Sequence, residues 1–386
     1  MWRFWKIPYL EQVCTCNLRQ LSVIMKQIRS FSEKAGLKPS FCYYKRWGVK
    51  KKQGHKPVLP LRFSKSGKPE IEKAYATHYV DRKRVEELKK EIEELKKEKN
   101  AVLMAHYYVD DEVQEIADYV GDSYYLAKMA VKESKDVICF AGVKFMGESA
   151  KILNPERTVV MPDENADCPM AHMVEIGKIQ EMRRKYDDLA VVCYINSTAE
   201  IKAYADVCVT SSNAMKVVKA LPQKNIFFIP DENLGRYIGS QVKDKNFIYN
   251  DGYCPVHKEI TAAKVKRAKE MHPAAEIVVH PECTPDVTAM GDYIGSTSGI
   301  IDYVTASEAK EFIVCTELGV LYELRRKNPD KVFYAAGQNQ FCADMKKITL
   351  ENVRDALRDM KNPVELPEEL RQKAKKALDA MLELAE

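Results

Sequence analysis

The chain has 386 residues, of which 46% are hydrophobic, so it is long enough for two or three domains with sizeable cores. Its 11 cysteines are odd in number and lack the paired spacings of a secreted disulfide framework, and no apolar run approaches the roughly 20 residues of a membrane helix. These features argue against the disulfide-rich secreted and membrane-spanning classes, and we expect a soluble protein of the cytoplasm.

The first 82 residues differ from the rest in charge. They hold 18 Lys or Arg and 5 Asp or Glu, a net charge of +13, so the remaining chain carries −8, since the total is +5. Weak periodicity and many Gly, Pro and Lys residues are typical of a disordered basic extension. It could touch nucleic acid or an acidic partner, or act as a targeting segment. We favour a start codon placed too early, with translation beginning at Met25 or near Val80.

Amphipathic helices are predicted on either side of the main body. Residues 81–100 have apolar side chains three and four residues apart among Glu and Lys, which favours a helix with one narrow apolar face. These apolar residues are Val85, Leu88, Ile92 and Leu95. The final segment, PEELRQKAKKALDAMLELAE, is predicted to form a second such helix, with its proline at the first helical position.

Between these helices the chain repeats itself three times. The units open with AVLMAHYYVDDEVQEIADYVGDS, AVVCYINSTAEIKAYADVCVTSS and EIVVHPECTPDVTAMGDYIGSTS. In each unit an aspartate follows the first His or Tyr by 12 residues, and a cysteine follows that aspartate by 48 or 50 residues. The aspartates are Asp118, Asp206 and Asp292, and the cysteines are Cys168, Cys254 and Cys342. A shared register of this kind predicts three copies of one supersecondary block.

Each unit has the pattern of an α/β fold. Apolar runs of four to six residues alternate with helical stretches, which favours short parallel sheets covered on both faces. We therefore predict three pseudo-symmetric α/β/α domains around a central point. The predicted bounds are residues 83–167 with 345–386 for the first unit, 168–253 for the second and 254–344 for the third.

One cysteine from each unit allows three thiols to meet at that central point. Three thiolates favour a metal site that keeps one coordination position open for substrate. The other cysteines within the units are expected to be inert buried thiols, because most lie inside strand-like runs. These are Cys139, Cys193, Cys208, Cys283 and Cys315.

Polar side chains follow the first strand of each unit, at the edge of a parallel sheet where ligands bind. They are His106 and Tyr108, Tyr194 and Asn196, and His280 and Glu282. The segments GDS, TSSN and GSTSG precede the next helix of the three units. A single Ser, Thr or Asn there is an ordinary helix cap, but three helix N-termini at one point would hold a ligand with several negative charges. The sequence therefore predicts a pocket for a substrate with several negative charges, such as a dicarboxylate together with a phosphate.

The motifs together resemble the quinolinate synthase family over about residues 85–386. The resemblance is carried by AHYYVDDEVQEIADYVGDS, MPDENADCPMA, YINSTAEIKAYADVCVTSSNA, DGYCPVH, VHPEC and DYIGSTSG. It implies three α/β/α domains around a [4Fe–4S] cluster, with Cys168, Cys254 and Cys342 as its ligands. It also implies condensation of iminoaspartate with dihydroxyacetone phosphate to quinolinate, with loss of phosphate and water, in de novo NAD biosynthesis.

The same resemblance implies roles for the polar residues. Tyr108 and His106 would serve the isomerisation of the triose portion, and Glu282 and His280 would transfer protons during cyclisation and dehydration. Tyr194 would act close to the cluster. The wider set expected to bind substrate is His106, Ser123, Tyr194, Asn196, Ser211, His257, His280, Glu282 and Thr297.

Partners follow from the chemistry of the implied substrates. Iminoaspartate is unstable, so an aspartate-oxidising enzyme in the same cell would supply it. We expect no membrane partner, and nucleic acid is not favoured as a partner.

Other functional classes remain open from the sequence. Zinc on the three cysteines would make a lyase or hydrolase acting on a phosphorylated substrate, because catalytic zinc sites also keep one open position. An iron–sulfur redox sensor with a nucleic-acid-binding tail is a second alternative, although a sensor has no need for so many polar residues at strand ends. A phosphosugar-binding protein that uses only the helix N-termini is a third.

Overall fold

The computed structural model describes residues 71–385, with side chains from Arg82 onwards. Residues 72–386 form one compact unit by their contacts. The predicted basic extension therefore lies outside the described residues, except for its last residues, which belong to helix α2 (Ile71–Glu98). In the part of the chain that the structure describes, no helix is long and apolar enough to span a membrane.

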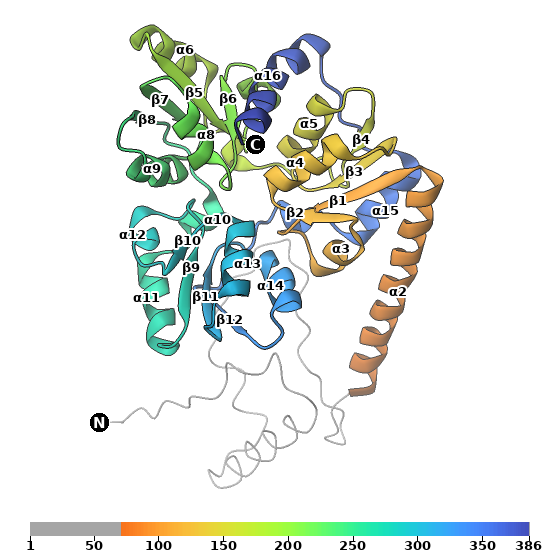
Figure 1. Ribbon diagram of the computed structural model, residues 1–386. Helices are drawn as coiled ribbons and strands as arrows, with labels where there is room; N and C mark the ends of the chain where they lie inside the picture. Colours follow the sequence, from red (N-terminus) through yellow and green to blue (C-terminus); the bar gives the residue numbers. More distant parts are fainter. Residues whose placement is uncertain (1–70, 386) are drawn as a thin grey trace, which may run out of the picture. The chain divides into compact units, whose positions relative to one another are not determined.

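The body contains three four-stranded parallel sheets, as the sequence predicts (Figure 1). The first has β1 (Ala101–His106), β2 (Tyr119–Gly121), β3 (Val137–Ala141) and β4 (Thr158–Val160). The second has β5 (Leu189–Tyr194), β6 (Val207–Val209), β7 (Asn225–Ile229) and β8 (Asn246–Tyr249). The third has β9 (Glu276–Val279), β10 (Tyr293–Ile294), β11 (Glu311–Cys315) and β12 (Val332–Ala335). In all three sheets the first strand lies between the second and the third, with the fourth at the far edge.

The repeated aspartates have a common structural role. The carboxylates of Asp118, Asp206 and Asp292 accept hydrogen bonds from backbone N–H groups of the first strand of their sheet, at 2.8, 2.7 and 2.8 Å. The backbone N–H of each aspartate donates in return to a carbonyl of the same strand. Each aspartate thereby ties the second strand to the first, which explains its fixed place in the repeat.

Helices connect the strands and cover the sheets. The first unit has α3 (Asp111–Ile116), α4 (Ser123–Lys132) and α5 (Lys144–Leu153). The second has η1 (Pro169–His172), α6 (Ile176–Lys185), α7 (Ala199–Lys202), α8 (Ala214–Ala220) and α9 (Glu232–Gln241). The third has α10 (Pro255–Lys258), α11 (Ala262–Met271), α12 (Pro285–Thr288), α13 (Thr297–Ala306), η2 (Leu318–Val320) and α14 (Leu321–Lys327). The chain ends with η3 (Met345–Lys347), α15 (Leu350–Asp359) and α16 (Glu368–Ala385).

The apolar core follows these layers. Strands β1, β3 and β5 are buried along their whole length, as expected for parallel strands covered on both faces. In the third sheet, neighbouring residues of one strand point to opposite faces: Ile277 joins one apolar cluster and Val278 the other. The strands of each sheet lie within the predicted ranges, while the limits of the three domains stay a prediction.

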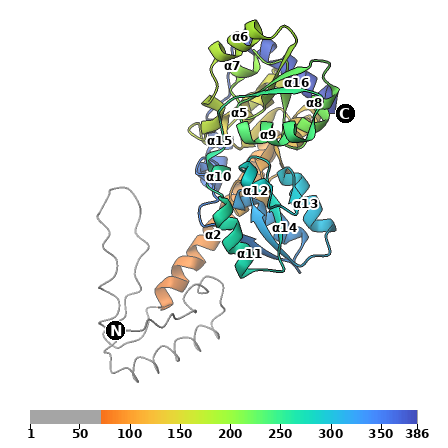
Figure 2. The ribbon, with the colours of Figure 1, turned by 90° about the vertical axis from the view of Figure 1, so that its left-hand side faces the viewer.

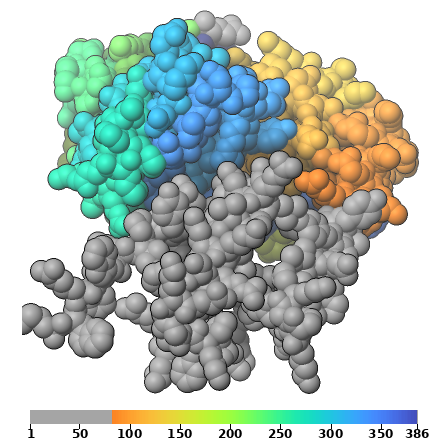
Figure 3. All heavy atoms as spheres, turned by 90° about the horizontal axis from the view of Figure 1, so that it is seen from below, coloured from red at the N-terminus to blue at the C-terminus, as the bar shows by residue number. Residues whose placement is uncertain are grey.

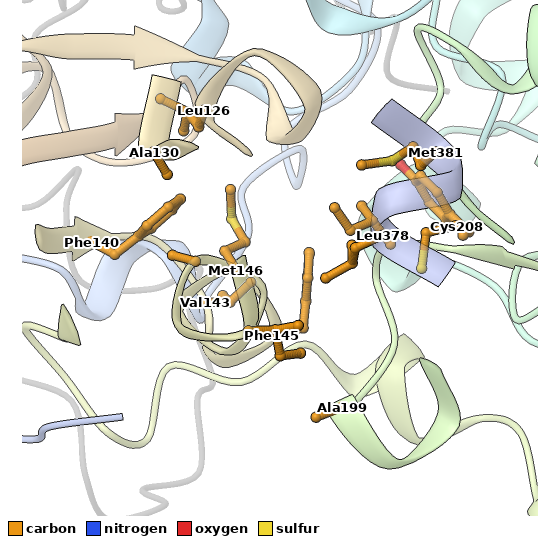
Figure 4. Packing of buried hydrophobic residues seen from close by; sticks show 14 of the residues in the cluster. Leu126, Ala130, Phe140, Val143, Phe145, Met146, Ala199, Cys208, Leu378 and Met381 are labelled. Atoms are coloured by element: carbon orange, nitrogen blue, oxygen red, sulfur yellow. The ribbon is translucent and has the colours of Figure 1, made fainter. Parts of the chain in front are cut away.

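A single apolar cluster joins the first two units. The last helix, α16, packs against α5 of the first unit and against β6 and α7 of the second. Figure 4 shows Phe145 and Met146 of α5 in this cluster together with Leu378 and Met381 of α16. Helix α16 therefore bridges two units, because its apolar face packs against both of them.

The first unit also meets helix α2 and the third unit. Helix α2 lies beside α15 at the outer side of the first unit (Figures 1 and 2), where Arg354 approaches Glu91 at 3.8 Å. In the space-filling view the third unit, coloured green-cyan to blue, lies next to the orange and yellow first unit (Figure 3). Buried Gln114 joins these two units, because its side chain donates to the carbonyls of Tyr107 and Gly319.

Candidate active site and metal centre

One cavity receives side chains from all three units. It lies at the carboxyl ends of the strands, because its lining residues follow β1, β5 and β9 or begin the next helices. Every residue that the sequence predicted for the site lines this cavity. They are His106, Tyr108, Ser123, Cys168, Tyr194, Asn196, Ser211, Cys254, His257, His280, Glu282, Thr297 and Cys342.

The three repeat cysteines stand just before short helical turns. Cys168 directly precedes η1 and Cys254 directly precedes α10, each with a proline at the first helical position, while Cys342 lies shortly before η3. Backbone N–H groups of these turns lie near the three sulfur atoms and oppose the rise that burial causes in the thiol pKa values. These groups belong to Met170 and Ala171 for Cys168, to His257 for Cys254, and to Asp344 and Met345 for Cys342.

The three repeat thiols line one cavity, where they could hold a metal group. Burial raises the pKa of each thiol, and for Cys168 the nearby thiol of Cys342 raises the pKa further. Without a metal the thiols are therefore neutral, whereas coordination to a metal deprotonates a cysteine outright.

A second arrangement of possible ligands surrounds Cys254. Its sulfur lies 3.1 Å from Nδ1 of His257, which in turn lies 2.6 Å from Oε2 of Glu282. One ligand atom from each of these three residues falls within 4.8 Å of the others, so the group could hold a single ion.

Glu282 is the charged centre of the site. Its side chain is buried beside His257 and lies 3.8 Å from Nδ1 of His280. Burial by itself would raise the pKa of Glu282, but the charge and hydrogen bond of His257 outweigh it and lower this pKa to about 2. The rings of the two histidines stack with their centroids 4.7 Å apart. Glu282 is therefore an ionised carboxylate held by imidazole groups.

His106 and His280 occupy equivalent positions in the repeat and share one local geometry. Nδ1 of His106 accepts the backbone N–H of Tyr108 at 3.2 Å, and Nδ1 of His280 accepts that of Glu282 at 3.3 Å. An accepting Nδ1 in a neutral ring places the proton on Nε2. Burial lowers the pKa of His106 to about 4 and that of His280 to about 3, so both rings are neutral at pH 7.

The Tyr108 side chain reaches from the first unit into the third. Its hydroxyl lies 2.8 Å from Oγ1 of Thr297 and 3.0 Å from Oγ1 of Thr316, and its ring meets that of His106 edge-on at 4.4 Å. Burial, together with the charge of Glu282, raises the pKa of Tyr108 well above its usual value. The hydroxyl is therefore a neutral proton donor at a fixed position.

The second unit contributes Tyr194 and Asn196 after β5. Burial and the nearby charge of Glu282 raise the pKa of Tyr194 well above its usual value. The side-chain oxygen of Asn196 is buried and has no hydrogen-bond partner among the described residues. A buried polar atom without a partner is costly, and this one lines the cavity, so a ligand group that donates a hydrogen bond would satisfy it.

The predicted anion-binding residues do not occupy equivalent structural positions in the three units. Ser123 and Thr297 are the first residues of α4 and α13, and those helices are capped by Asp122 and Ser296. Ser211 instead lies in a turn before the shorter helix α8, where its hydroxyl is 3.2 Å from Nε2 of His280. Two ten-residue helices therefore point their N-termini at the cavity, and the second unit offers a hydroxyl from a turn.

Comparison with known proteins agrees with the geometry. The family model of quinolinate synthetase A protein matches residues 90–383. The chain belongs to the quinolinate synthase family. A quinolinate synthase of Fusobacterium nucleatum is 56% identical over 288 residues, which cover 75% of this chain and 96% of that protein. One of Clostridioides difficile is 50% identical over 302 residues, 78% of this chain and 97% of that protein.

A third relative is slightly less similar. Quinolinate synthase 2 of Methanosarcina acetivorans is 46% identical over 305 residues, which cover 79% of this chain and 97% of that protein. Membership of the quinolinate synthase family makes this chain an enzyme of NAD biosynthesis. The family also implies a metal or iron–sulfur cofactor, and Cys254, His257 and Glu282 form a group that could hold a metal ion.

Some residues next to this cavity have no signal in the sequence. Thr316 bridges Tyr108 and His257, at 3.0 and 2.9 Å, yet a lone threonine after a strand is unremarkable in a sequence. Asp231 and Glu317 are fully buried close to Cys254 and Cys342. Asp231 and Glu317 do share one feature, since each comes two residues after the third strand of its sheet. Alignment of the repeated units would reveal this shared position once the strands are known.

Proposed function

We propose that this enzyme condenses iminoaspartate with dihydroxyacetone phosphate to form quinolinate, with release of inorganic phosphate and water, and that it uses a [4Fe–4S] cluster on Cys168, Cys254 and Cys342. The observation that carries the proposal is the meeting of three thiols, one from each repeated unit, in one cavity with buried acid–base groups. Bound there, the cluster would supply an iron without a protein ligand, which acts as a Lewis acid toward a carboxylate, carbonyl or hydroxyl.

Tyr108 and His106 are suited to the isomerisation of the triose. Interconversion of a ketose and an aldose moves a proton between neighbouring carbons and polarises the carbonyl oxygen. A neutral tyrosine hydroxyl and a neutral imidazole with its proton on Nε2 can each donate to that oxygen. Because Tyr108 is anchored by Thr297 and Thr316, its hydroxyl is already oriented when the substrate arrives.

Glu282 and His280 are suited to the later proton transfers. Ring closure and dehydration remove protons from carbon and deliver protons to leaving hydroxyl groups. Glu282 is the ionised acceptor of the pair, while His280 has a donor at Nε2, directed at Ser211. Tyr194 contributes a neutral hydroxyl close to this carboxylate.

The charges of the substrates suit the rest of the cavity. Among the described residues, no lysine or arginine lines it, so carboxylate and phosphate groups would rely on hydroxyls, imidazoles, helix N-termini and the metal. Ser123, Ser211 and Thr297 are the hydroxyls proposed for this role. Asn196 would accept from an amine or hydroxyl of the bound intermediate.

A zinc-dependent lyase or hydrolase remains the second candidate. It is favoured by one observation, the closeness of Cys254, His257 and Glu282, which could hold a single ion. Cys168 and Cys342 would then have no part in metal binding, whereas a cluster explains why a cysteine recurs in every unit.

Metal analysis separates these candidates. The protein is purified without oxygen as wild type, as Cys254→Ala and as Cys139→Ala, a control in which a buried strand cysteine outside the cavity is lost. We expect about four irons and four sulfides per chain in the wild type and in the control, and loss of both in Cys254→Ala. The wild type should then form quinolinate from the two substrates. Zinc without sulfide, or a cluster unaffected by Cys254→Ala, would refute the proposal.

The proposed substrates also suggest a setting in the cell. Iminoaspartate hydrolyses in water, so an enzyme that oxidises aspartate must supply it nearby. We propose the cytoplasm as the site of the reaction, because a cluster on cysteine thiolates needs a reducing compartment.

A further inference from the structure

Two buried carboxylates hold the cysteines of the second and third units in the same way. Asp231 comes two residues after β7 and Glu317 two residues after β11, and both side chains are fully buried. One oxygen of Asp231 accepts the backbone N–H of Cys254 at 3.2 Å. One oxygen of Glu317 accepts the backbone N–H of Cys342 at 3.1 Å.

The remaining oxygen of each carboxylate is bound to the start of its own helix. Oδ1 of Asp231 accepts the N–H of Leu234 in α9 at 2.7 Å, and Oε2 of Glu317 accepts the N–H of Gly319 in η2 at 2.6 Å. Each carboxylate thus connects a helix that leaves the sheet with the loop that carries the cysteine.

The first unit achieves the same contact with a different residue. Oδ1 of Asp167 accepts the backbone N–H of Cys168 at 2.8 Å, and its Oδ2 lies 2.8 Å from Nε2 of His172. All three repeat cysteines therefore donate their N–H to a carboxylate whose second oxygen has another polar partner.

The residue type follows from the number of acceptors that the position requires. A carboxylate offers two oxygens, whereas an amide of the same shape offers one oxygen and one NH₂ group that cannot accept. At Asp231 and Glu317 both hydrogen-bond partners are backbone N–H groups away from water. Nζ of Lys346 also lies 3.8 Å from Oε1 of Glu317. An amide at either position would turn its NH₂ group toward one of the two backbone N–H groups and leave that N–H without an acceptor. One of these two N–H groups belongs to the loop that carries the cysteine.

We propose that Asp167, Asp231 and Glu317 are positioning residues that fix the backbone of the three cysteines, so that the thiols are already arranged to bind and retain the cluster. The inference rests on the proposed function, because it requires that these cysteines hold the cluster. Outer groups that orient metal ligands typically change metal affinity by about 10–100-fold when they are replaced.

The test compares cluster retention in Asp231→Asn, Glu317→Gln and a matched control, Glu148→Gln. Glu148 is also buried, but among the described residues it accepts a single backbone N–H, that of Ala199 at 2.9 Å, and none from a cysteine. Each anaerobic protein is mixed at pH 8 with an iron chelator, and cluster loss is followed by its visible absorption. We expect release about 10–100-fold faster in the two cysteine-linked variants and a wild-type rate in the control.

Two further measurements separate positioning from a general loss of fold. The electron paramagnetic resonance spectrum of the reduced cluster should change in Asp231→Asn and Glu317→Gln but not in Glu148→Gln. Asp167 is only half-buried, so Asp167→Asn is expected to leave the far-ultraviolet circular dichroism of the protein unchanged. It should still release iron faster than the wild type.

The outcomes distinguish the two proposals. A wild type that binds no iron and sulfide would refute the proposed function, and this inference with it. A wild type that holds its cluster, with all three variants releasing iron at the wild-type rate, would overturn this inference and leave the proposed function standing. Equal acceleration in Glu148→Gln would also overturn it, because the effect would then belong to buried carboxylates in general.

Discussion

Replacing Tyr108 by phenylalanine tests the proposed chemistry most directly. The change removes only the hydroxyl, which bonds Oγ1 of Thr297 at 2.8 Å and Oγ1 of Thr316 at 3.0 Å. Thr316 keeps a second partner, Nε2 of His257 at 2.9 Å. Thr297 lines the cavity, where a water molecule can take the place of the lost hydroxyl. The structural damage should therefore be small.

The two expected effects differ in size. Two neutral hydrogen bonds contribute about 0.5–1.5 kcal/mol each, so Tyr108→Phe should lower the free energy of unfolding by about 1–3 kcal/mol. That loss leaves a protein with an ordinary stability of about 5–15 kcal/mol folded. Loss of a proton donor in the reaction should slow turnover by about 10²–10⁴-fold. Unfolding therefore cannot account for the expected loss of activity.

The assay measures quinolinate formed from iminoaspartate and dihydroxyacetone phosphate without oxygen, at equal iron content for each protein. Tyr107→Phe is the matched control, because this neighbouring tyrosine is buried but does not line the cavity. We expect the control to keep most of its activity. A turnover number for Tyr108→Phe close to that of the wild type, with the cluster intact, would refute the proposed role of the hydroxyl.

Three further predictions concern other parts of the site. Glu282→Gln should bind metal but lose turnover by about 10²–10⁴-fold, and quinolinate formation at the wild-type rate would contradict its role as a proton acceptor. Gly319→Ala should destabilise the protein by about 1–3 kcal/mol, since the added Cβ would lie 2.7 Å from the backbone oxygen of Tyr107; an unchanged denaturant midpoint would argue against this close approach. Because burial lowers the pKa of His106 from 6.5 to about 4, the unfolded chain takes up a proton first, so the metal-free protein should lose stability as the pH falls from about 6.5 to 4. Denaturant titrations should show a weaker pH dependence in His106→Gln, and an equal dependence in both proteins would exclude this histidine as the cause.

The fold was predictable because its signals are local and occur three times. Buried parallel strands need continuous apolar runs, and helices need apolar residues three or four positions apart, so both patterns are visible without any knowledge of packing. The repeat added information that a single copy lacks, because the three aspartates that tie the second strand to the first occur at the same position of every unit. The first helix was predicted to begin at residue 81, whereas α2 begins at Ile71. The reason is that the apolar spacing that identifies the helix begins only at Val85.

The chemical identity of the candidate site was also present in the sequence. His106, Tyr194 and His280 follow the first strand of their units, and the carboxyl ends of parallel strands are where such sheets bind ligands. Three copies of one block, each with one cysteine in register, were the basis for predicting that the thiols meet, and all three cysteines line the cavity. These inferences depend on residue type and spacing alone.

The tertiary structure decided which groups face one another across the units. Tyr108 contacts a threonine 189 residues away, and Asp231 and Glu317 bind the backbones of cysteines 23 and 25 residues further along. Local periodicity carries no information about such contacts, because they depend on how the three sheets pack against one another. The sequence thus determined the three-fold plan and the chemical groups at its centre, whereas packing between the units determined their hydrogen-bond partners and their protonation.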